Sequence, residues 1–294
     1  MKKINFSIVT ILAVALMFVF ASCTKDGVYK PKKKISKIYE TVQTDPNPEK
    51  ILKEIWTWDG KLLSKISYDD GDIVTFTYEK KQLTTINNGD TRIEINYDSK
   101  GKFIDNAKMY YKDVMYTTYT FQHDKNLISS YTVEYNGPGL ADNARSARII
   151  ENMFRFVAPE VAQNEVANFV KTAENNTKAD NSYTVYFVYD GKNVSEQTVK
   201  SGNSQVVYTY TYTDYKNLFY GLLTDMGIDM LSKNAPSTIL RTEAGKPDYN
   251  YTYTYQADGK IPTQVTENMT WTLSLGNTTT THTETKVTDY EYTK

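Results

Sequence analysis

The sequence predicts a mainly β protein: an antiparallel meander of about 14–16 strands that forms a strongly curved sheet or an open barrel. Apolar and polar residues alternate along many short segments, as where Val74, Phe76 and Tyr78 alternate with threonines. A period of two is typical of strands with one buried face. Short polar turns separate these segments, and one unit recurs along the chain. Open sheets of more than about ten strands tend to curl or split, which predicts the curvature.

The repeated unit is clearest between Trp56 and Ile86, which hold two copies. Each copy has an aromatic residue at a strand end, a polar turn, and a run with two apolar residues three apart. Related turn cores begin at Tyr97, Phe121, Tyr189, Tyr212 and Tyr255. Regular spacing of this kind is typical of repeated supersecondary units, here β-hairpins. The longer gaps after Phe121 and Tyr212 predict insertions.

Residues 1–22 have the layout of a bacterial signal peptide. Lys2 and Lys3 precede an apolar run that is shorter than the roughly 20 residues a spanning helix needs. The run ends at Cys23, which is the only cysteine of the chain. The segment Phe20–Cys23 resembles the lipobox of lipoproteins, with Phe20 where leucine is usual. We therefore predict lipid attachment at Cys23 and a membrane partner reached through acyl chains; an uncleaved anchor and ordinary cleavage are the alternatives.

Residues 23–34 are predicted to be a tether, because they are polar, lack periodicity and contain Gly27 and Pro31. Lys32–Lys34 within it offer charge to lipid headgroups, but a solvated linker is the favoured interpretation. The single β-rich domain is then expected to cover residues 35–294.

Two helical insertions are expected within this domain. The first covers about 142–172, where Asp142 is a plausible N-cap and apolar residues follow at helical spacing. It is expected to cover the concave face of the sheet. The second is a short or broken helix near 218–233, which contains Leu222 and Met226.

The net charge excludes one class of partner. Without residues 1–22 the chain keeps 32 basic and 35 acidic side chains, a net charge of −3. A weakly acidic protein has little attraction for nucleic acid or for an anionic membrane surface. We therefore expect no nucleic-acid partner, and we leave a protein of the envelope or a glycan as candidates.

No catalytic, metal-binding or cofactor-binding constellation is predicted, so the protein is not expected to be an enzyme. His123 and His282 are the only histidines and stand far apart in the sequence, unlike the ligands of common zinc sites. The turn Asp69–Asp72 lacks the ligand spacing of a calcium-binding loop and is interpreted as a hairpin turn.

Trp56 and Trp58 lie two residues apart on one predicted strand, so their side chains share a face. An exposed pair would stack on sugar rings, whereas a core position is the favoured interpretation. The main hypothesis is a lipid-anchored envelope protein that binds a partner or has a structural role without catalysis. The alternative is a glycan-binding surface lipoprotein that uses exposed tryptophans and tyrosines.

The motifs Tyr97–Lys102 (YDSKGK) and Tyr255–Ile261 (YQADGKI) resemble the YD-type repeats of RHS-like proteins. Together with the lipobox and Leu231–Ile239 (LSKNAPSTI), they make the chain similar to a family of exported lipoproteins of unknown function, numbered 4595. The resemblance covers most of Lys37–Val265, with Ala235 where leucine is expected. It implies a porin-like β fold and an outer-membrane or envelope location, and it brings no catalytic residues.

Overall fold

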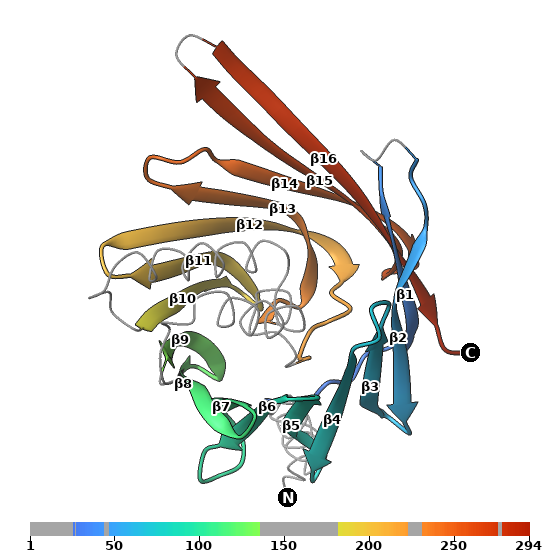
Figure 1. Cartoon of the computed structure of the whole chain (residues 1–294), viewed down its shortest axis with the longest axis vertical. Coiled ribbons are helices and arrows are strands. Elements are labelled where there is room, and N and C mark those ends of the chain that lie inside the picture. The colour runs from blue at the N-terminus through green and yellow to red at the C-terminus, as the bar shows by residue number, and fades with distance from the viewer. Residues whose placement is uncertain (1–25, 27, 44–46, 136–181, 223–230, 276–277) are drawn as a thin grey trace, which may run out of the picture.

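The computed structural model describes residues 26, 28–43, 47–135, 182–222, 231–275 and 278–294, which form sixteen strands (Figure 1). The first eight are β1 (Ile35–Val42), β2 (Ile51–Asp59), β3 (Leu62–Tyr68), β4 (Ile73–Glu79), β5 (Gln82–Asn88), β6 (Thr91–Tyr97), β7 (Ile104–Tyr111) and β8 (Val114–Asp124). The others are β9 (Leu127–Tyr135), β10 (Ser182–Asp190), β11 (Asn193–Ser201), β12 (Ser204–Lys216), β13 (Asn234–Glu243), β14 (Tyr249–Asp258), β15 (Ile261–Leu275) and β16 (Thr278–Tyr292).

The strands form one closed barrel (Figure 1). Each strand pairs antiparallel with its neighbours in sequence, and β1 pairs with β16 from Ile35 opposite Tyr292 to Val42 opposite Lys286. The predicted antiparallel meander of about 14–16 strands is confirmed. Closure goes beyond the predicted curved sheet or open barrel, because pairing of the first and last strands leaves no open sheet edge.

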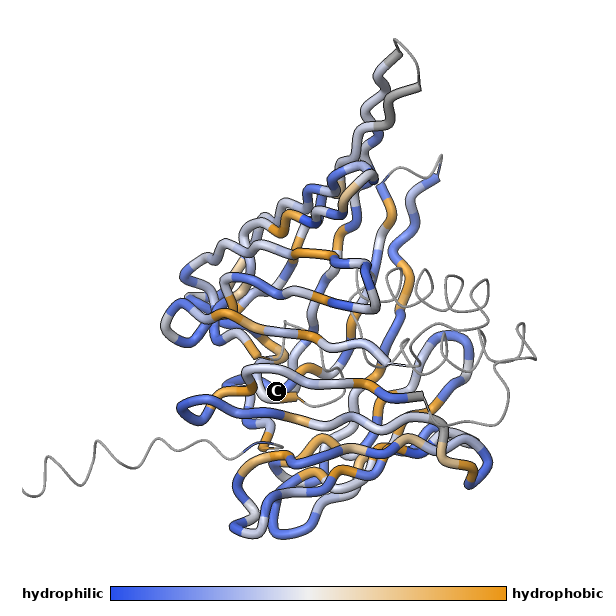
Figure 2. Tube along the Cα trace, turned by 90° about the vertical axis from the view of Figure 1, so that its left-hand side faces the viewer, coloured by the Kyte–Doolittle hydropathy of each residue, from blue (hydrophilic) through white to orange (hydrophobic). Residues whose placement is uncertain are grey.

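Hydrophobic and hydrophilic residues alternate along the strands of the barrel wall (Figure 2). In β4, Val74 and Phe76 are buried while Thr75 and Thr77 are exposed. In β12, Tyr208 and Tyr210 are buried while Thr209 between them is exposed. Successive side chains of a strand point to opposite faces, so the apolar set lies inside and the polar set lies outside.

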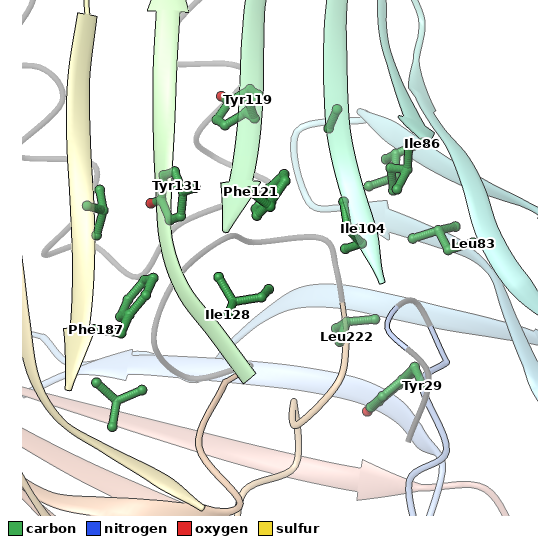
Figure 3. Packing of buried hydrophobic residues seen from close by; sticks show 14 of the residues in the cluster. Tyr29, Leu83, Ile86, Ile104, Tyr119, Phe121, Ile128, Tyr131, Phe187 and Leu222 are labelled. Carbon is green, nitrogen blue, oxygen red and sulfur yellow. The ribbon is translucent and has the colours of Figure 1, made fainter. Parts of the chain in front are cut away.

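The core is formed by inward-facing side chains from around the barrel (Figure 3). Its most completely buried members include Ile35, Leu63, Val74, Ile104, Met109, Val133, Val185 and Val194. Three core residues come from connecting segments instead of strands: Tyr29 precedes β1, and Leu218 and Leu222 follow β12. Figure 3 shows Tyr29 and Leu222 among the strand side chains. The N-terminal segment and the β12–β13 connection therefore contribute to the core.

The repeated sequence unit corresponds to a repeated bulge near the hairpin turns. The pairing register shifts at Thr57/Trp58, Thr77/Tyr78 and Gln122/His123, just before the turns that follow β2, β4 and β8. Bulges are common at the ends of barrels, where they increase the twist and re-aim a side chain.

We call the barrel end at which β1 begins the proximal rim. It consists of the segments that follow the even-numbered strands: 59–61, 79–81, 97–103, 124–126, 190–192, 214–217, 231–233, 258–260 and 293–294. The distal rim is the opposite end and consists of 42–43, 47–50, 68–72, 88–90, 111–113, 201–203 and 243–248.

The predicted helical insertion at 142–172 lies outside the described residues. Of the predicted helix near 218–233, residues 218–222 and 231–233 are described. Residues 218–222 form a turn, in which the Leu222 N–H donates to the Phe219 carbonyl at 2.8 Å, and Leu231 is helical. Within the described part of the chain, no helix has the length and apolar character needed to cross a bilayer.

Barrel closure predicts a large difference between two isoleucine truncations. Ile35 is 0% exposed at the β1–β16 seam, whereas Ile73 is 47% exposed on the outer face. Ile35→Ala is expected to lower the free energy of unfolding by about 2–5 kcal/mol, because it opens a cavity. Ile73→Ala, the matched control, is expected to change it by less than about 1 kcal/mol. Urea denaturation measures both, and equal losses would contradict the packing of the seam.

Candidate functional site at the proximal rim

A ring of side-chain hydrogen bonds joins neighbouring hairpins at the proximal rim. On seven of the eight even-numbered strands, an aromatic side chain donates to a backbone carbonyl of the preceding strand. The donors and acceptors are Trp58 to Ile35, Tyr78 to Leu63, Tyr97 to Leu83, Tyr189 to Ile128, Tyr212 to Val194, Tyr255 to Pro236, and Tyr292 to Pro262. We call these contacts the rim hydrogen bonds.

The rim hydrogen bonds explain the aromatic residue at the end of each repeated unit. An apolar ring covers the end of the core while its polar tip satisfies a backbone carbonyl. Burial raises the pKa of Tyr78, Tyr97, Tyr189 and Tyr292, so these hydroxyls remain protonated donors.

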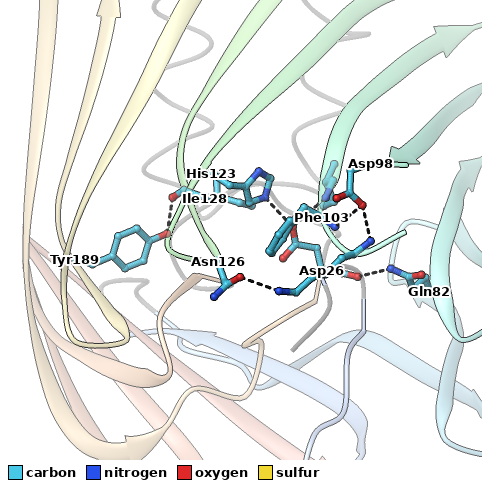
Figure 4. Close-up of polar contacts among 10 residues, drawn as sticks. Asp26, Gln82, Asp98, Phe103, His123, Asn126, Ile128 and Tyr189 are labelled. Carbon is cyan, nitrogen blue, oxygen red and sulfur yellow. Dashed lines mark hydrogen bonds and ion pairs between the residues drawn. The ribbon is translucent and has the colours of Figure 1, made fainter. Parts of the chain in front are cut away.

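The strand without a rim hydrogen bond is β8, and the N-terminal segment docks there (Figure 4). His123 follows the β8 bulge, in the place that Tyr78 has in β4. The carboxylate of Asp26 bridges the gap: Oδ2 lies 2.9 Å from His123 Nε2 and accepts from the Ile104 N–H at 3.0 Å. The Phe103 ring packs on the imidazole at 4.9 Å between centroids. Asp26 therefore joins β7 to β8 where the aromatic contact is replaced.

Further contacts hold the N-terminal segment against the rim. The Asp26 N–H donates to the Lys102 carbonyl at 3.0 Å, and Gln82 Nε2 donates to the Asp26 carbonyl at 3.2 Å. Tyr29 is 5% exposed, stacks on Trp58 at 5.9 Å, and donates to the Leu218 carbonyl at 2.7 Å. Asp26 and Tyr29 thus attach the segment predicted to be a tether to several parts of the barrel, while three of the four described lysines of this segment are exposed.

The connection between β12 and β13 contacts strands on other parts of the wall. The Phe219 ring lies 6.2 Å from the rings of Trp56 on β2 and Tyr290 on β16. Gly221 has φ +84° and faces the Val28 carbonyl, which a Cβ atom would approach to 3.4 Å. A glycine fits this position because the left-handed backbone is unstrained for it. The two connecting segments therefore meet at the proximal rim.

The tryptophan pair considered for glycan stacking does not form an exposed patch. Trp56 is 5% exposed and belongs to the core, and half-buried Trp58 is covered by Tyr29. The favoured core interpretation is confirmed. His282 stacks on Trp271 at 5.2 Å, far from His123 in the barrel order.

The acidic turn Asp69–Asp72 connects β3 to β4. Lys53 Nζ lies 2.6 Å from the Asp69 carboxylate, and Asp70 accepts from the Asp72 N–H at 3.0 Å. This is hairpin geometry, with a side chain capping the turn. Over the residues described, no group of three or more His, Cys, Asp or Glu side chains is placed to hold a metal ion. Cys23, the predicted lipid-attachment site, lies outside the described residues.

Sequence reasoning missed two acidic residues. Asp26 was assigned to the tether, although a histidine in place of the repeated tyrosine marks its docking point. Glu54 faces inward beside Trp56, whose indole N–H donates to it at 2.6 Å. The pKa of Glu54 is raised from 4.5 to about 7: burial is the main cause, the charges of Glu40 and Asp69 add to it, and the indole hydrogen bond opposes the shift. No sequence pattern distinguishes this carboxyl from the other acids.

Removal of the Asp26 carboxylate is expected to free the Ile104 amide. In Asp26→Ala, hydrogen exchange at Ile104 should become at least tenfold faster, and the free energy of unfolding should fall by about 1–2 kcal/mol. Asp59→Ala, which removes an exposed acid from the same rim, serves as the control. Unchanged exchange at Ile104 would show that Asp26 does not dock there in solution.

The raised pKa of Glu54 predicts a pH dependence of stability. The folded state binds this proton more tightly than the unfolded state, so its stabilising effect is complete below pH 4.5 and is lost as pH rises to about 7. The loss should reach at most about 3 kcal/mol. Glu54→Gln, which keeps an acceptor for Trp56, should flatten the dependence, while exposed Glu79→Gln should leave it intact. Urea denaturation at a series of pH values gives the free energy of unfolding of each protein. If its pH dependence is the same in the unsubstituted protein and in both variants, the raised pKa of Glu54 is disproved.

Comparison with known proteins supports the fold. The chain matches no family model and no curated protein sequence. A solved porin-like protein from Bacteroides uniformis is 13% identical, with a TM-score of 0.50, and the match covers 90% of this chain and 100% of that one. A porin-like protein from Bacteroides vulgatus is 11% identical, with a TM-score of 0.34 over 89% and 99% of the chains, and adds nothing to the argument. The chain therefore has a porin-like β fold.

Proposed function

We propose that this chain is a non-enzymatic lipoprotein of the cell envelope, anchored in the outer membrane through Cys23, whose barrel binds a partner or has a structural role. The docking of Asp26 carries this proposal. Cys23 precedes Asp26 by three residues, which span at most about 11 Å of extended chain. Acyl chains on Cys23 would therefore hold the proximal rim close to a bilayer.

The polar outer face of the barrel supports anchoring by lipid rather than insertion of the wall. A membrane-embedded barrel carries an outward apolar band about 25 Å tall. Here the outward positions of β14–β16 include Asn250, Thr252, Thr254, Thr270 and Thr283. The large exposed apolar side chains are spread over the wall: Ile51, Ile55, Ile73, Val114, Tyr186, Val188 and Leu240.

Glycan binding, the second candidate, rests on inward-facing aromatic residues of β14–β16 instead of the tryptophan pair considered above. Tyr249, Trp271 and His282 occupy directly paired positions on β14, β15 and β16 and are half-buried. Their rings stack in a row, with centroids 6.0 Å and 5.2 Å apart. Aromatic rows of this kind offer apolar edges beside polar groups, which suits sugar rings.

Lipid attachment is tested by Cys23→Ser in a bacterium that processes lipoproteins. The unsubstituted protein should be recovered with membranes, and its N-terminal peptide should carry the mass of the acyl chains. The variant should lack that mass, and its mature form should not be recovered with membranes. Neither protein should produce channels in planar bilayers, because the outer face is polar. An unmodified Cys23 thiol, or channel conductance, would refute the proposal.

A further inference from the structure

Charge is segregated between the two ends of the barrel. The proximal rim and the N-terminal segment carry fifteen lysines and eight acids in the described residues, a net charge of +7. The lysines are Lys30, Lys32, Lys33, Lys34, Lys61, Lys80, Lys81, Lys100, Lys102, Lys125, Lys192, Lys216, Lys233, Lys260 and Lys294. The described distal rim carries three lysines and eight acids, a net charge of −5. The chain as a whole is nearly neutral, so its net charge conceals this asymmetry.

The basic charge is accessible. Twelve of the fifteen proximal lysines are exposed, and each proximal hairpin connection carries at least one of them. Lysines from different connections also lie close together. The pKa of Lys216 is lowered, first by burial and then by the positive charges of Lys32, Lys233 and Lys260, while Asp214 opposes the shift. Basic side chains are therefore exposed on every hairpin connection of the proximal rim and gather most closely around Lys216.

Backbone conformation shows that some of these lysines occupy positions unfavourable to them. Lys80 and Lys81 form a two-residue turn with φ of 49° and 72°, and Lys125 has φ of 48° in the next but one hairpin. Such turns ordinarily contain Asn-Gly, because an L side chain with positive φ is strained. Gly60, Gly191 and Gly259 do occupy positive-φ positions in other proximal turns, each followed directly by a lysine.

We infer that the proximal rim is a docking surface for a bilayer with anionic lipid headgroups. Clusters of basic residues next to a membrane anchor are attracted to anionic headgroups, within about one Debye length of the surface. The docked N-terminal segment places the predicted anchor and the basic surface at the same end. The inference rests on the proposed lipid anchor for bringing the rim to a membrane, whereas the charge pattern itself does not depend on it.

The two attachments together would fix the orientation of the barrel. Acyl chains alone hold one point of the protein near the bilayer and leave the barrel free to tilt. A basic rim adds a second contact with the same bilayer, without any contact to another protein. Because the anchor already holds the rim near the headgroups, this contact forms at high effective concentration. The barrel would then stand on its proximal rim, with the acidic distal rim directed away from the headgroups.

The experiment places one fluorescent probe at either end of the full, lipoprotein-processed chain. Acylation blocks the thiol of Cys23, so dye labels only an introduced cysteine: Ser99→Cys at the proximal rim or Ser204→Cys beside the distal rim, both exposed. The protein is added to vesicles of phosphatidylcholine alone or with phosphatidylglycerol, each doped with a nitroxide-headgroup lipid. In the anionic vesicles, the probe at 99 should be quenched at least threefold more than the probe at 204.

A charge variant then tests the lysines without endangering the fold. Lys80→Asn, Lys81→Gly and Lys125→Asn together relieve positive-φ strain and should not destabilise the protein. They should nevertheless weaken the affinity for anionic vesicles, by roughly fivefold for each substituted lysine that contacts headgroups. The difference in quenching between the two probes should then disappear. The matched control is Lys112→Asn with Asp113→Gly, a distal turn with the same positive φ values of 48° and 63°, and it should preserve the difference.

The outcomes separate the two proposals. Recovery with neutral vesicles reports the acyl anchor, whereas the salt-sensitive increase of the probe contrast from neutral to anionic vesicles reports the basic surface. Three results would overturn docking of the basic rim even if the anchor is intact. They are equal quenching of the probes at 99 and 204, and equal effects of the proximal and distal variants on the quenching contrast. The third is a contrast that persists in 0.5 M salt, an experimental condition at which the Debye length is only a few ångströms. Loss of neutral-vesicle recovery with retained, salt-sensitive contrast would refute the anchor alone.

Discussion

The backbone pairing of β1 with β16 is the constraint on which the other features depend. An open meander of this length would expose two unpaired edges, and its inner face would have no fixed opposite wall. Closure satisfies the edges and sends alternate side chains of every strand inward, so that short apolar runs on sixteen strands become one core. It also gathers the hairpin turns into two rims, because every connection in an antiparallel meander alternates between the ends.

At the proximal rim, the rim hydrogen bonds convert a repeated sequence feature into a repeated contact between hairpins. Each aromatic side chain covers the end of the core and satisfies a carbonyl of the preceding strand. The exception on β8 is informative, since His123 does not complete the ring and the Asp26 carboxylate does. A single departure from the repeat thus coincides with the point at which Asp26 contacts the barrel.

The polar outer wall, the docked N-terminal segment and the basic proximal rim all agree with the proposed arrangement at a membrane. The wall offers lipid no continuous apolar band, the predicted acylated cysteine lies within a short span of Asp26, and the surrounding turns carry the lysines. Fold similarity to a porin-like protein does not require that this barrel conduct, because function depends on the groups that a fold presents. Here those groups are the lysines of the proximal rim.

The sequence by itself determined the strand content, the antiparallel meander and the inward set of apolar residues, because a period of two is a local property. It also determined that Trp56 and Trp58 share a face, and their burial followed the favoured interpretation. Closure, the docking of Asp26, the raised pKa of Glu54 and the segregation of charge were decided by the tertiary structure alone. Each depends on residues far apart in the chain: β1 meets β16, Asp26 meets His123, and lysines from separate turns reach one rim. A linear pattern records none of these distances, and a net charge averages over both ends.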